Sequence, residues 1–226
     1  MRPSALALLL AAACGKHGDG GAAAPATGDA GAPVPSAPAP LAGEVDRTLA
    51  NGLRLVLRPV PGTGAVALVT LLRIGADADP PGRSGMAHLM EHLLVTAATS
   101  AAPARSVDDW IRRYPAGWNA QTGSDYTVVA AIFPPDRLDA ELAEAAARLT
   151  DVRPQPDDLA REQPRLLAEV DNMFAWAALG APNRARERVR PTPGGGRKGG
   201  VPEQVRAVTL DEARARLAAH YRAGNA

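Results

Sequence analysis

Residues 15–43 limit how much of this chain can fold. Their sequence, GKHGDGGAAAPATGDAGAPVPSAPAPLAG, consists almost entirely of Gly, Ala and Pro. Such a segment has too few large apolar side chains to offset the entropy lost when a chain is ordered. We therefore expect a disordered tether in which His17 is a solvated bystander, followed by a folded domain over residues 44–226.

The first 14 residues, MRPSALALLLAAAC, have the pattern of an export signal. One basic residue precedes an apolar run, residues 5–13, that is too short to cross a bilayer as a helix. The small residues before Cys14 resemble a bacterial lipobox, although Leu10 lies one position earlier than the usual leucine. We expect export to the periplasm, with Cys14 as the lipidated residue of an anchored protein. The alternative is a plain signal peptide with an incidental cysteine, and a single cysteine excludes an intramolecular disulfide.

The charge of the chain gives no sign of a nucleic-acid partner. Lys and Arg number 25 against 24 Asp and Glu, so no strong field would attract nucleic acid or an acidic membrane surface. Basic residues gather in the Gly- and Pro-rich segment 180–202, but no aromatic residues interleave them, which favours a solvated loop over an anion site. We expect no nucleic acid, and contact with a membrane only through the lipid anchor.

The hydrophobic pattern of residues 44–226 predicts an α+β domain, with a mixed or antiparallel sheet packed against helices. Asn51-Gly52 between two extended runs predicts an opening β-hairpin, and the apolar run 65–74 predicts a buried strand. Residues 117–125 are polar and turn-rich, and a further strand is expected over 126–133. Helices are expected from residue 84 or 85, from 107, over 136–150, over 157–179 and from 210 to 221.

Three of these helices carry local signals for an end or a face. Ser106 is expected to cap the helix that follows it, because its hydroxyl can accept a free amide of the first turn. Thr209 and Glu212 form a capping box for the last helix. The helix over 136–150 places four apolar residues on one face, as expected for packing against a core. They are Leu138, Leu142, Ala145 and Leu149.

The stretch GMAHLMEH, residues 85–92, carries the residues best suited to chemistry. On a helix, His88, Glu91 and His92 fall on one face, opposite a face of Met and Leu. Two neutral imidazoles one turn apart suit Zn²⁺, which prefers tetrahedral ligation with one position left for water. Glu91 would then accept a proton from that water. The alternative is a buried amphipathic helix whose histidines are satisfied by hydrogen bonds, but the spacing favours a metal site that needs one further ligand.

The order HxxEH resembles the zinc centre of the M16 metallopeptidases, the pitrilysin and insulinase family. TLANGLRLVL resembles the opening hairpin of that family, SGMAHLMEHLL its zinc helix and WNAQTGSDYTVV the strand that follows. VTLDEARARLAAHYRAGNA resembles the segment that leads to the last strand of the first lobe. The resemblance covers about residues 44–226 and implies the α+β fold of the first M16 lobe, ending before its last strand and helix.

The resemblance also implies the remaining site residues. It implies one Zn²⁺ per chain held by His88, His92 and Glu169, with Glu91 as general base and Glu162 as a carboxylate that tunes the metal. Taken alone, Glu169 would be interpreted as a solvated helical carboxylate. Pro164 falls within the helix expected over 157–179, where it removes a backbone donor and predicts a kink or a new helix start. If the helix restarts there, Glu169 keeps its place and Glu162 need not.

The function implied by the resemblance is that of a zinc endopeptidase lobe acting on peptides or unfolded protein segments. An extended peptide would add as a strand to an exposed sheet edge near Asn119 and Ala120. Taken alone, Asn119 is predicted to be a loop residue. The resemblance implies a second M16-like lobe or subunit that encloses the substrate and supplies an Arg and Tyr pair. The alternatives are a non-catalytic interaction or assembly subunit and a truncated, inactive product.

Overall fold

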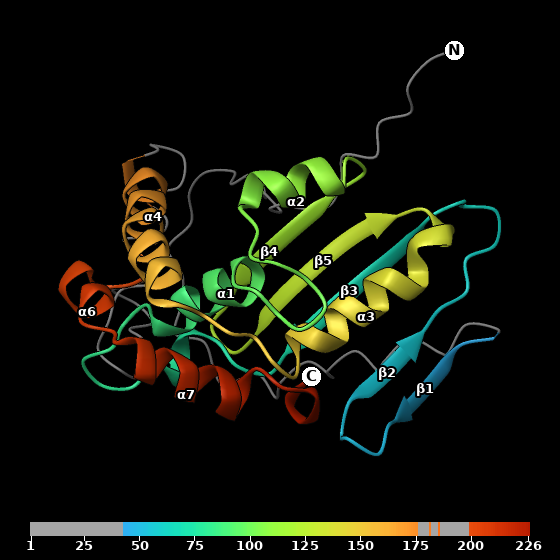
Figure 1. Ribbon diagram of the computed structural model, residues 1–226, viewed down its shortest axis with the longest axis horizontal. Helices are drawn as coiled ribbons and strands as arrows, with labels where there is room; N and C mark the ends of the chain where they lie inside the picture. Colours follow the sequence, from blue (N-terminus) through green and yellow to red (C-terminus); the bar gives the residue numbers. More distant parts are fainter. Residues whose placement is uncertain (1–42, 176–180, 182–184, 186–198) are drawn as a thin grey trace, which may run out of the picture. The chain divides into compact units, whose positions relative to one another are not determined.

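The computed structural model describes residues 43–175, 181, 185 and 199–226 (Figure 1). The export signal with Cys14, residues 15–42 of the tether and most of the basic segment 180–202 lie outside the described residues. The described residues belong to one unit, Leu41–Ala226. Among the helices that the structure describes, none is long and apolar enough to cross a membrane.

The described part opens with the predicted β-hairpin. Strands β1 (Val45–Thr48) and β2 (Arg54–Leu57) pair antiparallel, with Val45 opposite Leu57. Gly52 has a φ of 87°, in the left-handed region that an Asn-Gly turn requires. The side chain of Asn51 accepts the amide of Leu53 at 3.1 Å. The turn therefore forms where the sequence predicts it.

A second, three-stranded antiparallel sheet has the order β3-β5-β4. Its strands are β3 (Val66–Leu72), β4 (Trp118–Thr122) and β5 (Thr127–Phe133). The residue pattern alone predicted an irregular, turn-rich segment before residue 126, which was wrong for β4, whereas the strand implied by the family resemblance of WNAQTGSDYTVV is present. Its polar residues have low strand propensity, but pairing with β5 from Trp118 opposite Ala131 to Thr122 opposite Thr127 satisfies the backbone. The turn is confined to the residues between the two strands, where the Gly123 amide donates to the Tyr126 carbonyl at 2.8 Å.

Six α-helices and three short 3₁₀ turns are described, and two of the helices begin at predicted side-chain caps. Ser106 and Asp109 form a capping box at α2, and Thr209 and Glu212 form one at α7, which confirms both predictions. One short helix, α6, was not predicted, because its five residues carry no hydrophobic period. The helices are α1 (Met86–Thr96), α2 (Val107–Arg113), α3 (Leu138–Arg148), α4 (Pro156–Ala175), α6 (Pro202–Arg206) and α7 (Leu210–His220), and the 3₁₀ turns are η1 (Ala76–Ala78), η2 (Pro135–Arg137) and η3 (Ala223–Asn225).

Helix α1 lies at the centre of the hydrophobic core. It packs against β4, α4 and α7, and Figure 1 shows it between the sheet and these two helices. Leu89, Met90 and Leu93 have no exposed surface. They belong to one hydrophobic cluster with buried residues of β3, α4 and α7 and of the segment after α7, among them Leu72, Leu166, Val170, Leu217 and Tyr221. The core is thus built around the helix that carries the two histidines.

Helix α3 buries only part of the face that its apolar residues predict, because Leu149, directly after its last residue, is in the core but two leucines are not. Leu138 and Leu142 are 37% and 43% exposed, whereas Glu141, Glu144 and Arg148 are at most 7% exposed. The buried carboxylates are paired with arginines: Glu141 with Arg113 and Arg137, and Glu144 with Arg105 and Arg148. Periodicity failed for Leu138 and Leu142 because buried charges are stable when they are paired. Arg137 and Arg148 lie one turn from their glutamates, but Arg105 and Arg113 come from a distant part of the sequence.

Gly85, directly before α1, permits a close approach of two backbones. Its φ is 91°, and a Cβ atom placed there would lie 2.6 Å from the Gly200 Cα and 2.8 Å from a methyl carbon of Val205. These contacts bring residues 199–206 against the start of α1. Only glycine combines this φ with this contact.

We predict that Gly85→Ala lowers the free energy of unfolding by about 3 kcal/mol, from left-handed strain together with overpacking. Gly82→Ala is the matched control, because Gly82 has a φ of 76° and a Cβ there would meet nothing within 4 Å. This control should lose only the strain, about 1 kcal/mol. Urea unfolding measures the free energy of unfolding of both variants. Equal losses of stability in Gly85→Ala and Gly82→Ala would contradict the close approach of the two backbones.

Candidate metal centre

His88 and His92 lie one turn apart on α1 and face one carboxylate on α4. Their rings are edge to face, with centroids 4.9 Å apart and planes at 79°. The Nε2 atoms of His88 and His92 lie 3.6 and 3.5 Å from the two carboxylate oxygens of Glu169. The structure therefore brings together the three residues that the sequence singled out as ligands.

The arrangement of these three groups fits a zinc ion. Their ligand atoms all lie within 4.8 Å of one another. Two ligand atoms at about 2.1 Å from a tetrahedral ion are separated by about 3.4 Å, close to the spacing of each imidazole nitrogen from the carboxylate. Two imidazoles and one carboxylate also form the donor set of catalytic zinc sites, which leave one position for water.

Helix α4 runs without interruption through Pro164, so the expectation of a new helix start was wrong. Pro164 and Ala160 both lie on the exposed side of the helix. The carbonyl of Ala160 loses its usual donor to the proline, but at this position water can solvate it. Glu162 and Glu169, seven residues apart, therefore stay on the same face of one helix.

Glu162 is completely buried and orients one of the histidines. One of its carboxylate oxygens lies 3.2 Å from the Nδ1 atom of His92, and the other accepts the Nε of Arg161 at 2.9 Å. A proton on Nδ1, donated to Glu162, leaves the lone pair of His92 on Nε2, the atom that faces Glu169. The expectation that a restarted helix displaces Glu162 was therefore wrong.

Glu91 is 6% exposed and lies where the end of β4 meets α1. Its Oε2 atom accepts the hydroxyl of Thr122 at 2.6 Å. Burial raises the pKa of Glu91, while His88 and the Thr122 hydroxyl act against that rise. A buried carboxylate with a raised pKa beside two imidazoles is suited to accept and return a proton near neutral pH.

The carboxylates around the two histidines favour positive charge between them. Burial alone would lower the pKa of His92, but hydrogen bonds with Glu162 and Glu169 raise it to about 9. His88 and His92 in turn hold the pKa of Glu169 well below its usual range. The same electrostatics would favour a cation bound between Glu169 and the imidazoles.

Asn119 and Ala120 lie in β4, at an edge of the three-stranded sheet. Within the described residues β4 pairs only with β5, with Asn119 opposite Ala130. The interpretation of Asn119 as a loop residue was therefore wrong. Thr122, two residues after Ala120 in the same strand, contacts Glu91, so the free edge of β4 lies beside the candidate centre.

Two residues around the centre were missed in the sequence. Thr122 shares a face of β4 with Ala120, a relation that strand alternation would have shown had β4 been predicted. Asp79 accepts the amides of Gly85 at 2.8 Å and Ala87 at 2.7 Å, and so caps α1 from outside the helix. It lies six residues before Gly85 in an irregular segment, where no local pattern indicates a cap.

Fold and site together define an α+β domain with a His, His and Glu cluster between α1 and α4. The family model described as Insulinase (Peptidase family M16) matches residues 54–176, more than half of the chain. The chain belongs to peptidase family M16.

Two curated relatives are similar over parts of the chain. The zinc protease PqqE of Helicobacter pylori is 35% identical over 81 residues, which cover 35% of this chain and 18% of that protein. A protein of Rickettsia bellii described as an uncharacterized zinc protease is 25% identical over 122 residues, which cover 54% of this chain and 29% of that protein. The matches thus span less than a third of the length of these relatives.

Solved structures confirm the expected fold. A protease from Helicobacter pylori has a TM-score of 0.70 at 23% identity, over 80% of this chain and 44% of that chain. The first half of the periplasmic protease PqqL from Escherichia coli has a TM-score of 0.70 at 21% identity, over 80% of this chain and 41% of that chain. Pitrilysin has a TM-score of 0.68 at 19% identity, over 81% of this chain and 20% of that chain.

We predict that the chain binds one Zn²⁺ and that Glu169→Gln weakens this binding at least about tenfold, because the ligand loses its charge. Isothermal titration calorimetry with zinc measures the change. Asp171→Asn is the matched control, since Asp171 is an exposed carboxylate on the same helix. Equal affinities for the two variants would remove Glu169 from the ligand set.

Proposed function

We propose that this chain is the metal-binding lobe of a zinc endopeptidase that hydrolyses peptide bonds in extended peptides. The observation that carries the proposal is the convergence of His88 and His92 on Glu169, at 3.5 to 3.6 Å, with Glu91 on the same turn of α1. Membership of peptidase family M16 supports it, as do the names of the two curated relatives, both described as zinc proteases.

The roles of the side chains follow from their positions. His88, His92 and Glu169 would hold the ion, and Glu162 would keep the Nδ1 of His92 protonated. A bound Zn²⁺ would lower the pKa of water and polarise the peptide carbonyl. Glu91 would take one proton from the water as its oxygen forms the new C–O bond. It would then pass that proton to the amide nitrogen, so that the C–N bond breaks and the amine leaves. The Thr122 hydroxyl would orient the carboxylate of Glu91 through Oε2.

The free edge of β4 is the place where substrate would bind. A peptide in extended conformation would pair with the backbone of Asn119 and Ala120, so that main-chain hydrogen bonds supply affinity with little demand on sequence. Its scissile bond would then lie near Glu91, since the same strand ends at Thr122. Unfolded segments would be better substrates than folded proteins for this reason.

A second M16-like lobe or subunit would enclose the substrate. The chain spans less than half of each solved relative, and one of those relatives is itself described as the first half of a protease. On the sheet face turned away from the helices, Val69 and Leu71 are 59% and 49% exposed. A second lobe packed on this face would cover these two side chains.

We also propose that the chain is exported. The protease PqqL from Escherichia coli is described as periplasmic, and residues 1–14 of this chain have the pattern of an export signal. Lipidation of Cys14 would anchor the protein to the cell envelope; otherwise it would be soluble in the periplasm.

We predict that Glu91→Gln lowers kcat by about 10²–10⁴-fold and retains zinc, because the amide cannot accept the proton of water. Cleavage of an unstructured peptide and the zinc content of the purified variant are measured together, with the chain alone and with a second M16-like lobe. Zinc-loaded wild-type chain that cleaves no peptide under either condition would contradict the peptidase function and favour a non-catalytic assembly subunit.

We predict that Thr122→Val moves the acidic limb of the pH profile of kcat/KM to higher pH. The hydroxyl of Thr122 lowers the pKa of Glu91, so loss of the hydroxyl raises that pKa. As the pH is lowered, Glu91 of the variant is then protonated, and inactive as a base, at a higher pH than in the wild type. Thr150→Val, at an exposed position at the end of α3, should leave the limb unchanged. An unshifted limb in Thr122→Val would show that the limb reports another group.

A further inference from the structure

Helix α1 has no cap of its own at either end. Gly85 and Ala97 occupy the cap positions, and the helix has no acidic residue in its first turn and no basic residue in its last. The ends are nevertheless buried, since Ala87 and Thr96 have no exposed surface. Free amides and carbonyls at buried helix ends require partners, so other parts of the chain must supply them.

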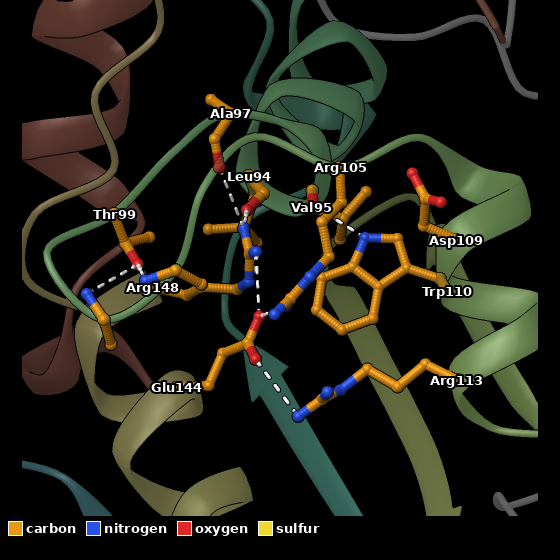
Figure 2. Close-up of polar contacts among 12 residues, drawn as sticks. Leu94, Val95, Ala97, Thr99, Arg105, Asp109, Trp110, Arg113, Glu144 and Arg148 are labelled. Carbon is orange, nitrogen blue, oxygen red and sulfur yellow. Dashed lines mark hydrogen bonds and ion pairs between the residues drawn. The ribbon is translucent and has the colours of Figure 1, made fainter.

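The partners at the two ends have opposite charge. Asp79 accepts two amides at the N-terminal end, where a helix dipole favours negative charge. At the C-terminal end the guanidinium of Arg148 donates to the carbonyls of Leu94 at 2.5 Å and Ala97 at 3.4 Å (Figure 2). Each charge therefore matches the end of the dipole that it faces.

Further donors complete the C-terminal end of α1. The indole nitrogen of Trp110 donates to the Val95 carbonyl at 2.8 Å, as Figure 2 shows. The backbone amide of Arg105 donates to the Thr96 carbonyl at 2.9 Å. Together with Arg148, these groups bind four consecutive carbonyls, those of residues 94–97.

Arg148 is itself held in place by its surroundings. It is 7% exposed, pairs with Glu144 at 3.1 Å, and its guanidinium carbon lies 4.8 Å from the centre of the Trp110 ring. Arg105 pairs with the same carboxylate from the other side and also lies over the ring (Figure 2). The buried polar face of α3 therefore holds a guanidinium against the end of α1.

The same end of α1 is joined to the chain that leads into α4. The seven residues between Arg148 and the start of α4 pass over it: the amide of Arg153 donates to the Ala98 carbonyl at 2.9 Å, and Asp151 accepts the amide of Ser100 at 3.1 Å. Arg148 thus lies where the histidine helix and the entry to the glutamate helix meet. A shift of α1 at this point would move His88 and His92 relative to Glu169.

We propose that Arg148 is a positioning residue for the metal centre: its guanidinium fixes the C-terminal end of α1 relative to the entry of α4. This inference rests on the zinc function proposed above. Arg148 would keep the three ligand atoms, which come from two helices, at the spacing that one ion requires. Small displacements of the ligands would weaken binding of the ion.

The test compares Arg148→Met with Arg137→Met in the full chain. Arg137 belongs to the same arginine and glutamate cluster but binds Glu141 and the Arg113 carbonyl, not α1. We expect Arg148→Met to weaken Zn²⁺ and Co²⁺ binding about tenfold or more and to alter the visible absorption of bound Co²⁺, and Arg137→Met to change neither. Arg148→Lys keeps the charge and should restore part of the affinity.

Three outcomes would overturn the inference. One is a folded Arg148→Met with the affinity and cobalt spectrum of the wild type, and another is an equal loss in Arg137→Met. If Arg148→Met does not fold, Arg148→Lys and Trp110→Phe take its place. Trp110→Phe removes the donor to Val95 and shrinks the ring against which Arg148 lies, and unchanged binding in both variants is the third outcome. A wild-type chain that binds no zinc would instead fail the proposed function and this inference together.

Discussion

The fold depends on burying one helix, α1, on nearly all sides although it carries three titratable side chains. An unpaired charge at such depth would be strongly destabilising. Each buried group therefore has a partner from another element: His92 has Glu162 on α4, and Glu91 has Thr122 on β4. These pairings fix how α1, α4 and β4 lie around one another, so the chemistry of the site and the packing of the core are the same set of contacts.

Features set by neighbours in the sequence could be predicted. The Asn51-Gly52 turn, the Ser106 cap and the Thr209 and Glu212 capping box each involve residues at most three apart, and all formed as expected. The one-turn spacing of His88 and His92 likewise follows from the geometry of a helix. The family resemblance added one prediction that local patterns could not make. Only the position of Glu169 relative to the family's motifs distinguished it from any other exposed helical carboxylate.

Features set by distant partners could not be predicted. Strand β4 forms because β5 is present to pair with it. The inward face of α3 is polar in part because Arg113 and Arg105, from another part of the chain, pair with Glu141 and Glu144. Pro164 did not break α4, because the carbonyl that it leaves without a donor lies on the exposed side of the helix. For β4 and α3, tertiary context overrode a local preference.

The centre is buried unevenly. His92 and Glu162 lie inside the core, whereas the side chain of Glu169 is 56% exposed. An ion at this position would therefore exchange with solvent past the exposed side chain of Glu169, without any opening of the core around α1. Occupancy would then follow the free metal concentration of the compartment, and a chelator could strip the centre while the domain stays folded.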